Sequence, residues 1–197
     1  MYVVIAEDDS DFNCLQVLIK RLANDQSVSI KGQGFGCCGD MLKKSANVLS
    51  LWDKNENYRK FIICYDKDKD NAQKRYEEVI SKIIKPSGIK KPENLICILI
   101  PTEEVEAWIL ADIQAVSKVI PSWQPKDIYP SPERIENPKE VLKRLSRINK
   151  PRPLYNHASD NEKIMGHLDL AVLKNKCPSF AELAAFVESG KANYPNR

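Results

Sequence analysis

The chain has 197 residues, and its 30 basic and 27 acidic side chains leave a net charge of +3. That length suits one domain with a sizeable core, or one domain with a smaller appendage. The near balance of charge does not by itself indicate a nucleic-acid-binding protein. No apolar run approaches the roughly 20 residues that a membrane-spanning helix needs, so we expect no membrane span.

The six cysteines are scattered along the chain and form no CxxC pair. We therefore expect reduced thiols in a cytoplasmic protein, with neither disulfides nor zinc. An apolar strand pattern follows Met1 directly, without a basic segment, so no signal peptide is expected. The oligomeric state stays open between a monomer and a homo-oligomer.

Apolar runs alternate with helical patterns in the first part of the chain. The expected strands cover residues 3–6, 27–32, 59–65 and 95–100, and the expected helices cover 11–22 (after a cap at Asp9 or Ser10), 40–52, 71–84 and 103–111. A glycine-rich turn is expected at residues 33–36. This βαβαβαβ order is typical of a Rossmann-like α/β fold, with a mainly parallel four-stranded sheet and helices on both faces.

Five prolines change the pattern between Ile120 and Pro138. We expect an ordered strap there, because proline interrupts both helices and strands. Three helices follow, the first opening at Pro138, the second capped by Ser159 or Asp160 and the last capped by Ser179, before a frayed tail from Gly190. The expected organisation is an α/β domain in residues 1–118, and a strap with a helical extension in residues 119–197 that packs on the same domain.

Acidic residues gather where three of the predicted strands end. They are Glu7 after the first strand, Asp66 and Asp68 after the third, and Glu103, Glu104 and Glu106 after the fourth. Sites form at this edge of open α/β sheets, and carboxylates crowded there repel one another. Mg²⁺ or Mn²⁺ prefers such hard oxygen ligands, so the pattern indicates a divalent metal site. The alternative is that Lys67, Lys69 and Lys82 neutralise the acids.

Two short motifs resemble those of the Toprim fold, in which one strand ends in Glu-Gly-x-Thr-Glu and a later strand ends in Asp-x-Asp. Glu7, Ser10 and Asp11 match the first motif, although Asp8 stands where the family usually has glycine. The segment Tyr65-Asp66-Lys67-Asp68 matches the second motif. The departure at Asp8 removes the close backbone approach that glycine permits.

Longer segments resemble an uncharacterised Toprim-like family, related to nucleases of the overcoming-lysogenization-defect type, that is found beside ATPases in phage-defence gene clusters. The matching segments are residues 100–112, 130–133, 137–140 and 177–180. The resemblance implies a Mg²⁺-dependent nuclease that cleaves DNA or RNA and works as an anti-phage effector with an ATPase partner. Glu7 would be a metal ligand or a general acid/base, and Asp66 and Asp68 would be metal ligands.

The same resemblance makes Glu103 and Glu106 candidate ligands of a second metal ion. Residues three apart share a face of a helix, so these two carboxylates are expected to point together while Glu104 diverges. Two ions about 4 Å apart would stabilise the attacking and leaving oxygens at a phosphate. The basic helix from Lys139 to Lys150 is a candidate for holding phosphates by charge.

Other functions stay open beside the nuclease. A non-catalytic Toprim-like module that binds a partner or a nucleotide agrees with the departure at Asp8 and with the modest net charge. A response-regulator receiver would use Asp66 as phosphoacceptor and Thr102 after the fourth strand, but the sequence lacks its fifth strand and the lysine that follows. His157 and His167 have no partner at metal-ligand spacing, and we expect them to be surface or packing residues.

Overall fold

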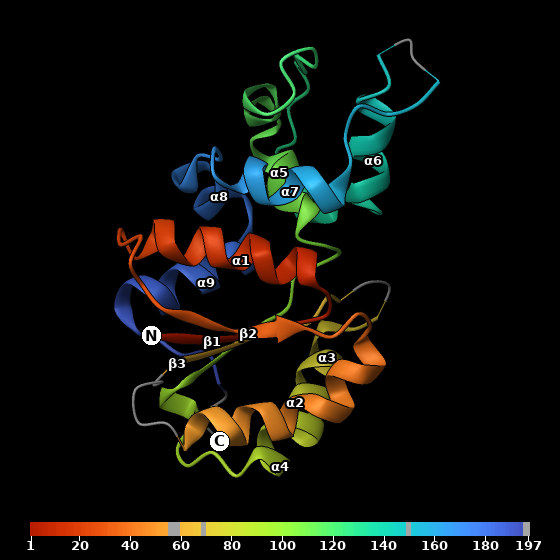
Figure 1. The fold of residues 1–197 in the computed structure, drawn as a ribbon. Helices are drawn as coiled ribbons and strands as arrows, with labels where there is room; N and C mark the ends of the chain where they lie inside the picture. Colours follow the sequence, from red (N-terminus) through yellow and green to blue (C-terminus); the bar gives the residue numbers. More distant parts are fainter. Residues whose placement is uncertain (55–59, 68–69, 149–150, 195–197) are drawn as a thin grey trace.

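The fold is organised around a four-stranded sheet in which every pairing is parallel (Figure 1). The computed structural model describes residues 1–54, 60–67, 70–148 and 151–194. The strands are β1 (Tyr2–Ala6), β2 (Ile30–Gly34), β3 (Lys60–Cys64) and β4 (Ile96–Leu99), in the order β2-β1-β3-β4. The expected α/β fold, with a parallel four-stranded sheet flanked by helices, is therefore confirmed.

The second strand lies further along the chain than its sequence pattern indicates. It begins at Ile30 and continues through Gly34, where a turn is expected from the glycines. Glycine is needed at this point because a Cβ on Gly34 would lie 2.0 Å from the carbonyl carbon of Asp8. The close approach allows the Phe35 N–H to donate to the carbonyl oxygen of Glu7 at 3.1 Å. The end of β2 is thereby fixed against the segment that follows β1.

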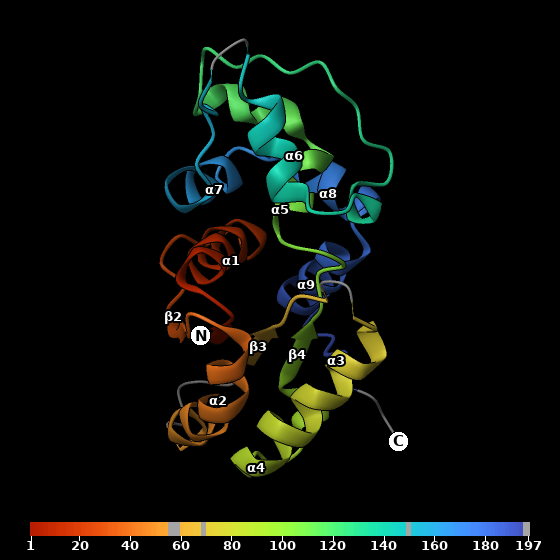
Figure 2. The ribbon, with the colours of Figure 1, turned by 90° about the vertical axis from the view of Figure 1, so that its right-hand side faces the viewer.

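Helices cover both faces of the sheet. Helices α1 (Asp9–Leu22) and α9 (Pro178–Ser189) lie on one face, and α2 (Cys38–Asp53), α3 (Ala72–Glu78), η1 (Val79–Ile84) and α4 (Lys85–Ser87) lie on the other (Figure 2). Strand side chains alternate between the faces, so Val4 belongs to the cluster under α1 while its neighbours Val3 and Ile5 belong to the cluster over α2. Both clusters are buried at β1 and β4 and at residues 61–64 of β3, which explains the continuous apolar runs of these three strands.

The helix expected over residues 71–84 is present as three consecutive pieces. A π-helical turn, η1, joins α3 to α4, and the run ends where Gly88 adopts a left-handed conformation with φ of 74°. A short 3-10 turn, η2 (Pro92–Asn94), then leads into β4. The apolar side chains of this segment, including Val79, Ile83 and Ile84, pack against the sheet.

A further layer of helices stacks on α1 rather than on the sheet (Figure 2). It consists of α5 (Glu106–Ala111), η3 (Ile113–Lys118), α6 (Pro138–Leu145), α7 (His157–Met165) and α8 (Leu170–Lys176). Arg21 of α1 joins the layers by donating to the carbonyl oxygens of Met165 at 2.6 Å and Leu168 at 2.7 Å. In the described part of the chain, no helix is both long enough and apolar enough to cross a membrane.

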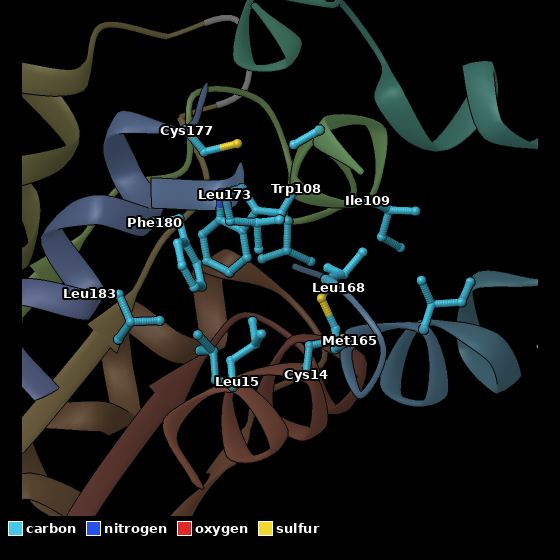
Figure 3. Packing of buried hydrophobic residues seen from close by; sticks show 14 of the residues in the cluster. Cys14, Leu15, Trp108, Ile109, Met165, Leu168, Leu173, Cys177, Phe180 and Leu183 are labelled. Atoms are coloured by element: carbon cyan, nitrogen blue, oxygen red, sulfur yellow. The ribbon is translucent and has the colours of Figure 1, made fainter. Parts of the chain in front are cut away.

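Trp108 lies at the centre of this packing, between the C-terminal helices and α1 (Figure 3). Its ring meets Phe180 edge-on, with centroids 5.4 Å apart, and its indole N–H donates to Glu133 at 3.2 Å and to Ser179 at 3.0 Å. Glu133 belongs to the short turn η4 (Pro132–Arg134) of the proline-rich strap and is itself buried. This carboxylate fastens the strap to α5 and to the start of α9.

The described part of the C-terminal tail is docked, whereas its sequence predicts fraying from Gly190. The side-chain amide of Asn193 pairs with the open edge of β4: it donates to the Ile98 carbonyl oxygen at 2.7 Å and accepts from the Ile98 N–H at 2.8 Å. An edge strand has unpaired backbone groups, and this amide satisfies two of them. The prediction failed because a lone asparagine in a polar tail gives no signal of a distant backbone partner.

Candidate metal and active site

Two of the predicted ligands meet at the carboxyl edge of the sheet. Glu7 follows β1 directly, and Asp66 comes two residues after the end of β3. The Asp66 N–H donates to Oε1 of Glu7 at 3.1 Å, although the residues are 59 positions apart in the chain. Both side chains are half-buried, and Oδ1 of Asp66 is shielded from solvent. Because β1 and β3 are parallel neighbours, their ends bring these acids together.

This meeting point is the topological switch of the sheet. The chain passes from β1 to β2 on one side and then returns to β3 on the other side of β1. The connections from β1 and β3 therefore leave the sheet in opposite directions, and ligands of open α/β sheets bind in the crevice between such connections. Glu7 and Asp66 occupy this position.

The remaining predicted ligands lie near this edge or outside the described residues. Asp68 falls outside the described residues. Glu103 follows β4, and its carboxylate lies 3.6 Å from the ammonium of Lys67. Lys67 also donates its backbone N–H to the carbonyl oxygen of Pro101 at 2.9 Å. The loops after β3 and β4 thus run side by side, and one of the lysines considered for neutralisation is present there, whereas Lys82 pairs with Glu78 instead.

The prediction that Glu103 and Glu106 share a face of one helix is wrong. Helix α5 begins at Glu106, three residues later than the sequence pattern suggests, so Glu103 precedes the helix. Glu104 and Glu106 converge instead: Lys139 Nζ lies 2.9 Å from Oε1 of Glu104 and 3.7 Å from Oε1 of Glu106. Pro101 and the turn after it delay the helix, which changes the pairing of the acids. A metal-binding role for Glu103 and Glu106 stays a prediction.

Glu106 is almost completely buried, with 3% of its side chain exposed. Its Oε1 accepts a hydrogen bond from Asn161 of α7 at 3.0 Å, and Asn161 in turn accepts one from the Tyr155 hydroxyl. Burial raises the pKa of Glu106, and Lys139 opposes this rise by its positive charge. The carboxylate is therefore held by a lysine of α6 and an asparagine of α7.

Asp11 is missing from the predicted ligands, although it matches the second acid of the first motif. It lies in the first turn of α1 and is buried. Burial raises the pKa of Asp11 well above its usual value, and the negative charges of Asp8, Glu106 and Glu7 raise it further. The helix is capped by Asp8, which accepts from the Asp11 N–H at 2.9 Å, rather than by Asp9 or Ser10.

Basic residues and a histidine complete the surroundings of Glu104. Helix α6 ends at Leu145, and its first lysine, Lys139, points to the acids, while Lys143 pairs with Glu140 of the same helix. His157 opens α7, and its Nδ1 is buried with no hydrogen-bond partner among the residues that the structure describes. Burial lowers the pKa of His157, and the positive charges of Lys139 and Lys143 lower it further. The basic helix therefore includes a lysine, Lys139, whose ammonium contacts Glu104 and the buried Glu106.

The donor types at the sheet edge fit a hard divalent cation. Glu7 and Asp66 supply carboxylate oxygens, and Mg²⁺ at phosphate-binding sites is commonly held by one or two carboxylates together with water and substrate oxygens. Within residues 1–54, 60–67, 70–148 and 151–194, no three His, Cys, Asp or Glu side chains lie close enough together to hold a metal ion. The third motif acid, Asp68, is outside those ranges.

A family model described as Domain of unknown function (DUF4276) matches residues 4–188. The chain belongs to this family. The DUF4276 match begins in β1 and reaches α9, so it includes the sheet edge, the strap and the helices around Lys139. Comparison with curated proteins and comparison with solved structures gave no match.

Proposed function

We propose that the protein is a Mg²⁺- or Mn²⁺-dependent nuclease of the Toprim type that cleaves phosphodiester bonds in DNA or RNA. The observation that carries the proposal is the contact between the Glu7 carboxylate and the Asp66 N–H at the switch point of the sheet. The two motifs that resemble Toprim supply these two residues. The anti-phage role, the ATPase partner and the cytoplasmic location rest on the sequence: the first two on the longer segments of resemblance, the last on the scattered cysteines.

The chain's own residues have distinct tasks in this proposal. Glu7 and Asp66, with Asp68 as the third motif acid, would hold the ion. When bound, the ion would polarise a phosphate oxygen as a Lewis acid and lower the pKa of a bound water. In its acid/base role, the Glu7 carboxylate would accept a proton from the attacking water. The Asp66 N–H fixes the orientation of Glu7 for either task.

The test is cleavage of plasmid DNA and of tRNA with Mg²⁺ or Mn²⁺, in the presence and absence of any ATPase encoded beside the gene. We expect cleavage that chelation by EDTA stops and that Asp66→Asn abolishes. Asp9→Asn is the matched control, because Asp9 is an exposed acid in the same region. No cleavage of either substrate, or equal cleavage by Asp66→Asn, would overturn the proposal.

A non-catalytic Toprim-like module is the second candidate, and the lysines favour it. Lys67 lies beside Glu103, and Lys139 lies beside Glu104 and Glu106, so three of the edge acids have basic neighbours within the chain. Calorimetry separates the two functions. A module would bind an ATPase partner or a nucleotide without binding millimolar Mg²⁺, whereas a nuclease needs the metal. The receiver function would show itself as stable phosphorylation of Asp66, but no strand follows β4 in the described residues.

A further inference from the structure

Lys139 is bound to Glu104 through both its backbone and its side chain. Its N–H donates to Oε2 of Glu104 at 3.2 Å, and its ammonium donates to Oε1 at 2.9 Å. The two oxygens of one carboxylate therefore face the first turn of α6 and the lysine that this turn carries. A carboxylate in this position also complements the N-terminal end of α6, whose cap residue Asn137 provides no side-chain cap.

The same ammonium lies 3.7 Å from Oε1 of Glu106, a carboxylate that is almost fully buried. Asn161 donates to the same oxygen at 3.0 Å. Lys139 and Asn161 thus approach Glu106 from α6 and α7, two helices that the sequence places far from α5. A buried carboxylate requires a nearby positive charge or hydrogen bonds, and here it has both.

Lys139 also affects the pKa values of two buried acids. The charge of Lys139 opposes the rise in the pKa of Asp11, just as it opposes the rise in the pKa of Glu106. Burial lowers the pKa of Lys139, but Glu106, Glu104 and Asp11 outweigh it, and the net direction is upward. The ammonium therefore stays protonated between the carboxylates of Glu104 and Glu106.

We propose that the ammonium of Lys139 takes the place of a second divalent ion between Glu104 and Glu106, so that the protein binds one metal ion, at the sheet edge. The single ion at Glu7 and Asp66 rests on the proposed function, whereas the replacement by Lys139 rests on the contacts around the lysine. Lys139 is thus a positioning residue: it supplies a fixed positive charge and links α6 to Glu104 and Glu106.

The test is a calorimetric titration of the full chain with Mn²⁺, which counts the bound ions. Wild type should bind one ion, Asp66→Asn should bind none, and Glu106→Gln should still bind one. Lys139→Gln should bind two ions, and the double variant Lys139→Gln/Glu106→Gln should return to one. Lys139→Arg is the matched control, because it keeps the positive charge and should bind one ion like the wild type.

Two results would overturn the proposal. One is a wild type that binds two ions and loses one of them in Glu106→Gln; this comparison decides the matter even where circular dichroism shows Lys139→Gln to be unfolded. The other is a folded Lys139→Gln that gains no ion. If the wild type binds none while Lys139→Gln gains one that depends on Glu106, the sheet-edge metal site fails and the assignment of Lys139 stands.

Discussion

The two acidic regions of the protein are built in different ways. At the sheet edge, Glu7 accepts from a backbone N–H, that of Asp66, and both residues follow neighbouring strands. In the helical region, Glu106 is reached by Lys139 and Asn161, side chains from helices that come later in the chain. The first arrangement depends on strand order, and the second depends on how three helices pack.

This difference indicates that Glu7 and Asp66 form the candidate site, whereas the helical acids support the structure around it. The donor at the edge is a backbone N–H two residues after a strand of the sheet, and sites supported by rigid elements hold ligands accurately. The helical acids are buried or half-buried and stand against a lysine, as expected for charges that stabilise packing or set the charge of a site. The four predictions below test whether the two regions have these separate roles.

The largest effect should come from the edge itself. Glu7→Gln removes a candidate metal ligand or general base and should lower the rate of cleavage by about 10²–10⁴-fold. Glu106→Gln should retain most of the rate, because its carboxylate is committed to Lys139 and Asn161. Initial rates on whichever nucleic acid is cleaved give the comparison. Equal losses in the two variants would make both regions parts of one catalytic centre.

Gly34→Ala should destabilise the packing of β2 against the segment that follows β1. Its Cβ would lie 2.0 Å from the backbone of Asp8, which cannot move without disturbing the segment after β1, so we expect a loss of about 3 kcal/mol in the free energy of unfolding. Gly39→Ala is the control, since a Cβ there meets nothing within 4 Å. Urea denaturation should show little change or a slight gain for Gly39→Ala. A stable Gly34→Ala would contradict the close approach of β2 to Asp8.

Substitutions of the two lysines should differ in how much they lower the free energy of unfolding. Lys139→Gln leaves Glu104 and the buried Glu106 without their cation and should cost about 1–2 kcal/mol of unfolding free energy, since 27% of the lysine side chain is exposed and partly screened. Lys67→Gln should cost less than about 1 kcal/mol, because 17% of the side chain of its partner Glu103 is exposed, whereas only 3% of the Glu106 side chain is exposed. Urea denaturation at low and high salt measures both. The reverse order would show that the edge pair stabilises the fold more.

The smallest effect concerns pH. Because the pKa of Asp11 is raised, chiefly by burial, the folded chain holds a proton that the unfolded chain releases, so stability falls as pH rises from about 4. Asp11→Asn cannot lose a proton, and its stability relative to the wild type should therefore increase between about pH 4 and pH 7. Urea denaturation across this range measures the difference. Asp9→Asn, at an exposed position, should run parallel to the wild type.

The sequence predicted the fold well where one local signal was enough. The apolar runs gave the parallel strands, and acids directly after them gave the edge that holds Glu7 and Asp66. Boundaries failed where a neighbour overrode the pattern: Gly34 extends β2 because Asp8 packs against it, and α5 starts late after Pro101. The sequence predicts a frayed tail at Asn193, because no residue near it in the chain indicates its partner, Ile98, which is 95 positions away.

The sequence by itself determined that acids follow the first and third strands closely, and in a parallel sheet the carboxyl ends of the strands share one edge, where Glu7 and Asp66 lie. Strand periodicity is a local property and can be read from hydrophobic patterns, whereas the strand order that makes β1 and β3 neighbours is a long-range property. Only the tertiary structure decided that Lys139, rather than a neighbour in sequence, lies between Glu104 and Glu106. That choice depends on the packing of α6 and α7 against α5, and the energy of such long-range packing is spread over many side chains, none of which has a sequence pattern of its own.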